Sequence, residues 1–255
     1  MPRLALVSSL CLAFVAAAAP PARTQENAAI CKDEGTPPDA AIAACSKIIS
    51  VSKAKTNDLA STYYNRAIAY RQRNELDNAL WDYSDAIKIN PKHARAFNNR
   101  GTIYKEKGDL DRALADFSEA IRLDPKLAAA YFNRGNAYDD KGDAEKALAD
   151  LETAIKLDPK NAAALTVRGV VWKRKGDIER AVADFTQAIE LDPAYAIAYA
   201  NRGDAWEEKG ESEKALADLV RAINLNPNST RALAVRGYLY RKKGDLDRAI
   251  VDYGE

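Results

Sequence analysis

The sequence holds few residues that could carry out catalysis. Its one histidine, His93, follows Pro91 in a stretch between apolar segments, where a solvated loop histidine is expected. Two cysteines, Cys31 and Cys45, remain if the N-terminal segment is removed, and two are too few for a structural zinc site without histidine ligands. No glycine-rich phosphate-binding loop is present. The sequence therefore predicts a non-catalytic protein with no cofactor and no metal ion.

Arginine and aspartate recur in register along the chain. An arginine returns every 34 residues from Arg66 to Arg236, and an aspartate returns with the same step from Asp116 to Asp252. Such arginines could form an anion-binding ladder. The favoured interpretation is structural, with stems packed between helix pairs and guanidinium groups bonded to backbone or to a nearby aspartate. Repetition also argues against one special acid–base pair among the aspartates.

These residues belong to a unit of 34 residues, of which residues 99–125 contain a typical copy. A fixed period of this size indicates a solenoid. Within each unit, apolar residues recur at helical spacing in two blocks, which predicts two helices. The units begin near Ala60, Ala94, Ala128, Ala162, Ala196 and Thr230.

The two glycines of each unit have different predicted roles. Gly108 separates the two helices ahead of Asp109 as N-cap, and the first unit replaces it with Asn74, which tolerates a left-handed backbone. Gly101 lies inside the first helix, and the first unit replaces it with Ala67, which is small but not flexible. Because a glycine inside a helix costs about 1 kcal/mol relative to alanine, Gly101 and its copies predict a close contact between helices.

This pattern resembles the tetratricopeptide repeat family. Each unit carries, in order, an aromatic residue or leucine, glycine or alanine, tyrosine or tryptophan, Gly-Asp, alanine, an aromatic residue, alanine and proline, with small departures, over about residues 60–255. The resemblance implies an all-α fold in which antiparallel helix pairs stack into a right-handed α-solenoid. It also implies that the first helices of the pairs line a concave face, where partners bind.

The chain divides into three predicted segments. Residues 1–22 join a basic residue, a short apolar run and small residues, as in a signal peptide cleaved after Ala18, the alternative being an uncleaved membrane anchor. Residues 23–57 form an N-terminal segment, and residues 58–255 hold six tandem units. The last unit stops inside its second helix, and solenoids generally need a polar cap at each end. Either the sequence is a fragment, or a partner or a second copy is expected to cover this last face.

The N-terminal segment is expected to cap the stack. Residues 23–36 are polar and are expected to be irregular, whereas residues 38–49 align with the second helix of later units and predict a degenerate half-repeat. Export to an oxidising compartment predicts a disulfide between Cys31 and Cys45, the alternative being two free thiols.

Asparagine precedes the recurring arginine in four of the six units, and Val167 and Val235 interrupt the row. An amide offers both a donor and an acceptor, which suits the backbone of an extended peptide; the alternative is that the amides bond locally within their helix pairs. Binding is expected to centre on the second and third units, where charged and apolar side chains stand beside the amides. The predicted partner-binding residues are Asn65, Asn99, Asn133, Asn201, Arg95, Asn98, Phe132 and Asn136.

The charge balance argues against nucleic acid as a partner. The chain has 38 lysines and arginines against 37 aspartates and glutamates, a formal charge of +1, whereas nucleic-acid-binding domains usually show a clear basic excess. Charged pairs close the first helices and alternate in sign from Asp139-Asp140 to Arg241-Lys242. They predict ion pairs between neighbouring units or, alternatively, a groove for a zwitterionic partner.

The expected function is that of an exported scaffold, secreted or periplasmic, that binds a protein or an extended peptide on its concave face. No stable membrane insertion is expected after signal cleavage. The alternative is a structural subunit, a homo-oligomer that associates end to end through its uncapped last repeat.

Overall fold

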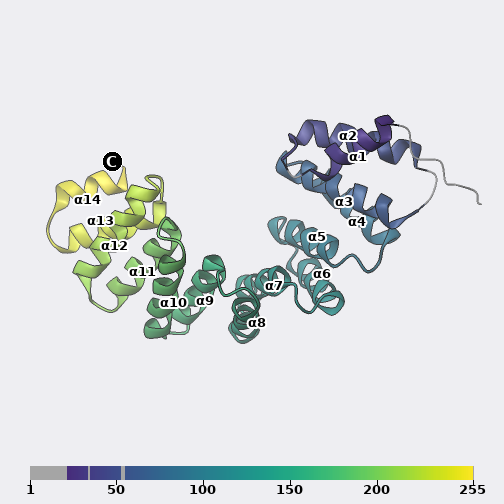
Figure 1. Ribbon diagram of the computed structural model, residues 1–255. Coiled ribbons are helices and arrows are strands. Elements are labelled where there is room, and N and C mark those ends of the chain that lie inside the picture. Colours follow the sequence, from purple (N-terminus) through teal and green to yellow (C-terminus); the bar gives the residue numbers. More distant parts are fainter. Residues whose placement is uncertain (1–21, 34, 53–54, 255) are drawn as a thin grey trace, which may run out of the picture.

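The computed structural model describes residues 22–33, 35–52 and 55–254, and these residues form helices joined by turns and short loops (Figure 1). Residues 1–21 of the predicted signal peptide lie outside the described residues. Within the described part, no helix is both long enough and apolar enough to cross a membrane. The helices are α1 (Ala22–Lys32), α2 (Pro38–Val51), α3 (Asn57–Gln72), α4 (Leu76–Ile89), α5 (Ala94–Glu106), α6 (Leu110–Leu123), α7 (Ala128–Asp140), α8 (Ala144–Leu157), α9 (Ala162–Arg174), α10 (Ile178–Leu191), α11 (Ala196–Glu208), α12 (Ser212–Leu225), α13 (Thr230–Lys242) and α14 (Leu246–Tyr253).

The helices pack as consecutive pairs along an open arc (Figure 1). Consecutive helices contact each other all along the described chain, from α1 to α14. The first helices of neighbouring repeats also contact each other, as α5 does α7, whereas α6 and α8 make no comparable contact among the described residues. The first helices therefore lie on the inner side of the arc, where Figure 1 shows α5 and α7. The predicted all-α solenoid of helix pairs is confirmed.

The turn between the two helices of a repeat has the predicted geometry. Gly108 adopts a φ of +79°, and Asn74, at the same place in the first repeat, adopts a φ of 60°. The side chain of Asp109 accepts a hydrogen bond from the backbone N–H of Arg112 at 3.0 Å, which caps α6. The left-handed residue ends the first helix, and the aspartate begins the second.

The glycine inside the first helix marks a close contact, as predicted. A Cβ atom added to Gly101 would lie 2.9 Å from Cε1 of Phe117 and 3.1 Å from Cβ of Asp116. Phe117 is fully buried, so its ring has little room to move away. In the fourth repeat, a Cβ atom added to Gly169 would lie 2.6 Å from Cε1 of Phe185.

The recurring arginines are structural. Arg100 donates from Nε and Nη2 to the two carboxylate oxygens of Asp116, both at 2.8 Å, and from Nη1 to Oγ of Ser84 in the preceding repeat at 3.1 Å. One guanidinium group thus joins the two helices of its own repeat and reaches the neighbouring one. This confirms the structural interpretation over an anion-binding ladder. The same two-point pair recurs as Arg66–Asp82, Arg134–Asp150, Arg168–Asp184, Arg202–Asp218 and Arg236–Asp252.

The N-terminal segment is a complete helix pair, so the expectation of irregular structure is wrong for residues 23–32 and is confirmed for residues 33, 35 and 36. Helix α1 covers residues 22–32 and packs against α2 and α3. Its sequence has no apolar stripe at helical spacing. A helix of this length is marginal by itself and depends on tertiary packing. Cys31 and Cys45 form the predicted disulfide, with their Cα atoms 5.1 Å apart.

Candidate functional site

The candidate site is the inner surface of the arc, formed by the first helices of the pairs, and we call it the concave groove. Its best-defined feature is a chain of amides across three repeats. Asn133 Nδ2 donates to Asn98 Oδ1 at 3.0 Å, and Asn98 Nδ2 donates to Asn99 Oδ1 at 3.1 Å. Asn99 Nδ2 in turn donates to the hydroxyl oxygens of Tyr64 at 3.2 Å and Tyr83 at 3.4 Å. The structure thus brings three of the predicted asparagines together.

Two other predicted amides lie on the same helices without a hydrogen bond to any described residue. Asn65 on α3 and Asn136 on α7 are half-buried and keep their donors and acceptors unused. Arg95, at the start of α5, is exposed and forms no ion pair with a described residue. These three side chains are available to a partner.

Asn201 is set apart from this group. Its side chain is only 3% exposed, its Nδ2 donates to the backbone oxygen of Ile197 at 2.9 Å, and its Oδ1 accepts from Arg231 at 2.6 Å. Phe132 is half-buried and packs against the apolar cluster that contains Leu148. Both are therefore engaged within the fold, although Phe132 keeps part of its ring accessible.

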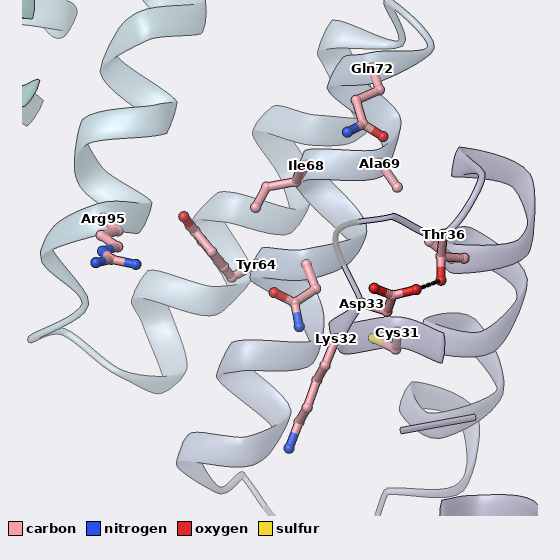
Figure 2. Close-up of a pocket in the computed structure, with 11 residues that line it drawn as sticks. Cys31, Lys32, Asp33, Thr36, Tyr64, Ile68, Ala69, Gln72 and Arg95 are labelled. Atoms are coloured by element: carbon pink, nitrogen blue, oxygen red, sulfur yellow. Dashed lines mark hydrogen bonds between the residues drawn. The ribbon is translucent and has the colours of Figure 1, made fainter. Parts of the chain in front are cut away.

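Two adjoining pockets lie at the N-terminal end of the concave groove. The first, of about 90 Å³, lies between α1, α3 and α5, and Figure 2 shows the labelled residues that line it. The second, of about 410 Å³, shares Ile68 and Gln72 with the first and extends to Tyr83 and Asn99. The first pocket is lined by Cys31, Lys32, Asp33, Thr36, Ala41, Tyr64, Asn65, Ile68, Ala69, Gln72 and Arg95.

Sequence reasoning did not identify Ile68 or the hydroxyl group of Tyr83 as part of the groove. Tyr83 occupies the position of Phe117 in the next repeat, and its ring is fully buried. Its hydroxyl group nevertheless accepts a hydrogen bond from Asn99, and Tyr83 is among the residues that line the second pocket. Burial raises the pKa of Tyr83, so the hydroxyl keeps its proton and can act as a donor. The signal was present in the sequence as a tyrosine where the next four repeats have phenylalanine or leucine.

His93 borders this end of the groove. Its ring lies against Tyr64 with the ring centroids 4.7 Å apart, and its Nδ1 accepts a hydrogen bond from the backbone N–H of Ala96. Burial lowers the pKa of His93 below the usual value, so the neutral, accepting form is favoured. The histidine thus caps α5 and is not the freely solvated loop residue expected from the sequence.

The charged pairs that close the first helices bind each other across repeats. Arg71 donates to Glu106 at 2.6 Å, and the arrangement recurs along the groove. This confirms the interpretation that neighbouring repeats exchange ion pairs, each worth only about 0–1 kcal/mol at an exposed site. The other cross-repeat pairs are Lys105–Asp140, Arg174–Asp139, Lys173–Glu208 and Lys242–Glu207.

Among the described residues, no group of histidine, cysteine, aspartate or glutamate side chains could hold a metal ion.

Solved structures with the same architecture include YrrB, described as a TPR protein with an unusual peptide-binding site. It is 27% identical, covers 78% of this chain and 97% of its own, and has a TM-score of 0.59. A tetratricopeptide repeat protein from Parabacteroides merdae is 20% identical over 91% of both chains with a TM-score of 0.73. MamA is 23% identical over 69% of this chain and 96% of its own, with a TM-score of 0.58.

Family models match most of the repeat region. One described as TPR repeat matches residues 67–108, 101–142 and 173–210. Two described as Tetratricopeptide repeat match residues 128–161 and 208–255. No curated protein matches the chain significantly. The repeat matches and the stacked helix pairs agree, and the chain belongs to the tetratricopeptide repeat family.

Proposed function

We propose that this protein is an exported, non-catalytic scaffold whose concave groove binds an extended segment of another protein. The observation that carries the proposal is the set of amides on the inner face of α3, α5 and α7. Asn65 and Asn136 have unused donors and acceptors beside the chain formed by Asn98, Asn99 and Asn133. A peptide backbone offers one donor and one acceptor per residue, which such amides can match.

Three further observations support this proposal. YrrB, which shares this fold at 27% identity, is itself described as having a peptide-binding site. The Cys31–Cys45 disulfide is typical of an oxidising compartment, which agrees with the signal-like pattern of residues 1–22. The charged side chains that flank the groove neutralise each other across repeats, so a long polyanion such as nucleic acid would find little uncompensated positive charge there.

The test begins with selection of phage-displayed dodecapeptides on the oxidised full chain. Fluorescence anisotropy then measures the dissociation constants of the selected peptides. Replacement of either unused amide, in Asn65→Ala or Asn136→Ala, should weaken binding by about 1 kcal/mol, as expected for one lost hydrogen bond, and should leave the melting temperature unchanged. Asn201→Ala is the matched control, because that amide already bonds within the fold; it should lower stability and leave binding intact.

The amides of the chain should behave differently from the unused ones. Asn99→Ala and Asn133→Ala remove bonds between repeats as well as possible bonds to a peptide, so both stability and affinity should fall. The absence of any peptide that competes at this face would refute the proposed function. The proposed function would also be refuted if all four variants bound the peptide as tightly as the native chain. These variants are Asn65→Ala, Asn136→Ala, Asn99→Ala and Asn133→Ala.

An end-to-end assembly is the alternative, and exposed apolar side chains on the last described helix favour it. Leu246 on α14 is 59% exposed and Val251 is 74% exposed. Light scattering coupled to size exclusion separates the two functions. A mass that rises with concentration, and that falls to the monomer value in a Val251→Asp variant, would support assembly through α14.

A further inference from the structure

One junction between repeats departs from the hydrogen-bonding pattern of the others. At four junctions, a serine or threonine on the preceding second helix accepts a hydrogen bond from Nη1 of the recurring arginine. These pairs are Ser46–Arg66, Ser84–Arg100, Ser118–Arg134 and Thr186–Arg202. Between the third and fourth repeats this position is Glu152, and between the fifth and sixth it is Val220. Nη1 of Arg168, the arginine that follows Glu152, makes no hydrogen bond to a described residue.

Glu152 lines a pocket of about 530 Å³, which we call the convex pocket. The pocket lies between Ala149 and Glu152 on α8 and Ala183 on α10, and Arg168 and Trp172 reach it from α9. The second helices lie on the outer side of the arc, as Figure 1 shows for α8. The convex pocket is therefore separate from the concave groove, which the first helices form.

The convex pocket contains one negative charge that the fold does not balance. The other charged residues of its lining belong to the ion pairs Glu145–Lys175, Arg180–Asp177 and Arg168–Asp184. Glu152 is exposed and forms no hydrogen bond or ion pair with a described residue. Because each pair is neutral, the carboxylate of Glu152 leaves the pocket with an excess of one negative charge.

Arg168 does not remove this excess. It donates from Nε and Nη2 to the two carboxylate oxygens of Asp184, at 2.8 and 2.7 Å. The pKa of Arg168 is raised mainly by the hydrogen bond to Asp184, and Glu152 adds a smaller electrostatic effect. One guanidinium group thus faces two carboxylates, and the geometry favours Asp184.

The walls of the convex pocket suit a long side chain that ends in a positive charge. Ala149 and Ala183 are exposed and present small apolar side chains, and Leu148 joins them in the lining. Lysine and arginine lay their methylene stems on such a surface while the charged end reaches a polar group. The ring of Trp172 already holds Arg180, whose guanidinium carbon lies 3.6 Å from the ring centroid. Glu152 is therefore the group left to bind a second cation.

From these observations we infer that the convex pocket binds a lysine or arginine side chain of a partner protein, and that Glu152 recognises its charge. Charge complementarity selects this partner, because a carboxylate and a basic side chain form charge-assisted hydrogen bonds. The inference goes beyond the proposed function, since the site lies on the opposite side of the arc and does not require a peptide in the concave groove.

The test selects peptides that depend on Glu152. Phage-displayed dodecapeptides are selected on the immobilised, oxidised full chain in the presence of excess free Glu152→Ser chain. This competitor removes peptides that bind elsewhere, including those that bind the concave groove. The surviving peptides should contain a lysine or an arginine. Fluorescence anisotropy at low ionic strength should show about tenfold weaker binding when that lysine is replaced by norleucine or that arginine by citrulline.

Variants of Glu152 and a matched control test the recognition of charge. Glu152→Gln and Glu152→Ser should each weaken binding about tenfold. Glu152→Ser should not lower the melting temperature, because a serine at this position bonds the arginine at other junctions, so unfolding cannot explain the lost affinity. The control is Glu190→Gln. Glu190 is an exposed residue of α10 that forms no ion pair with a described residue and does not line the convex pocket, so this variant should bind as the native chain does.

A second arm tests the location of the site. Ala149→Lys places a cation of the chain itself three residues before Glu152 on α8, and this spacing brings the two side chains together on a helix. Peptide binding should weaken about tenfold. Ala115→Lys is the matched control, because Ala115 is the exposed equivalent on α6 and lies outside the convex pocket. It should leave the affinity unchanged.

Three results would overturn the inference. The first is that no peptide survives the competition. The second is that the surviving peptides bind equally well without their lysine or arginine. The third is that Glu152→Gln or Ala149→Lys binds the peptides as the native chain does. None of these results would affect the proposed function of the concave groove, whose test depends on Asn65 and Asn136.

Discussion

The N-terminal helix pair and the second repeat hold their two helices together by different means. In the second repeat, the ring of Phe117 lies against Gly101, close enough that a Cβ atom there would come within 2.9 Å of it. In the N-terminal pair, Cys45 stands where the alignment places Phe117, and a disulfide to Cys31 joins the helices instead.

The difference concerns how many residues each solution requires. Packing a ring on a glycine needs matched small and large residues at several positions of both helices, so the pattern is visible in the sequence. A disulfide needs two cysteines at the right distance, and the other residues are free to change. A disulfide therefore allows α1 to carry polar residues, one of which, Lys32, lines the first pocket. Four experiments test or sharpen this comparison.

The largest effect is expected from Phe117→Ala. Its ring is fully buried between α5 and α6, and such a truncation typically costs about 3–5 kcal/mol. Urea unfolding followed by circular dichroism measures the change. Because a solenoid is stabilised through nearest neighbours, hydrogen exchange should rise most in α5, α6 and the adjoining repeats. A uniform rise along the whole chain would contradict this one-dimensional picture.

Removal of the disulfide in Cys31→Ser/Cys45→Ser should cost less and act locally. The cysteines are 14 residues apart, and closure of a loop of this size contributes about 3 kcal/mol in the chain-entropy model. Hydrogen exchange should reveal unprotected amides in α1 and native protection from α5 onward. Equal protection of α1 in both proteins would show that packing alone holds this helix.

A moderate effect is expected when the glycine contact is filled. Gly169→Ala places a Cβ atom 2.6 Å from Cε1 of the buried Phe185, and overpacking costs about 1–3 kcal/mol, part of which is offset by the gain of about 1 kcal/mol in helix propensity. Ala67→Gly is the reciprocal control in the first repeat. Ala67→Gly should also lower the free energy of unfolding. The loss should be limited to the lower helix propensity of glycine and to the packing of one methyl group. Stabilisation of Gly169→Ala would refute the close contact.

The smallest effect concerns pH and the start of α5. Burial lowers the pKa of His93 below its ordinary value of 6.5, so the folded chain binds this proton less tightly than the unfolded chain. The contribution to stability is therefore complete above pH 6.5 and is lost as the pH falls through the lower, folded-state pKa. Since this is the one histidine of the chain, its ring protons give an unambiguous NMR titration.

His93→Asn is the matched variant for this pH effect, because asparagine keeps an N-cap acceptor and does not titrate in this range. Its unfolding free energy should lack the component of the pH dependence between neutral and mildly acidic solution. A measured pKa at or above 6.5 would contradict the burial of the imidazole against Tyr64.

Much of the repeat architecture was predictable, since it depends on local chemistry that recurs. The left-handed turn follows from Gly108 and Asn74, the cap from Asp109, and the close contact from the exchange of Gly101 for Ala67. The candidate site was less predictable. Asn98, Asn99 and Asn133 do meet, but Asn201 turns inward to Ile197 and Arg231. One position in the repeat thus has two environments, set by neighbours in other repeats.

The sequence by itself determined the helix pairs of the repeats, their turns and the solenoid, because each depends on residue spacing or on residues close along the chain. The disulfide was predicted from the expected oxidising compartment and not from spacing. Only the tertiary structure decided that residues 22–32 form a helix, that the hydroxyl group of Tyr83 bonds to Asn99, and that Lys32 and Arg95 line one pocket. These features depend on contacts between residues that lie far apart in the chain. The repeat pattern in the sequence does not predict such contacts. A repeat period shows what the units share, whereas the pocket forms where the units differ.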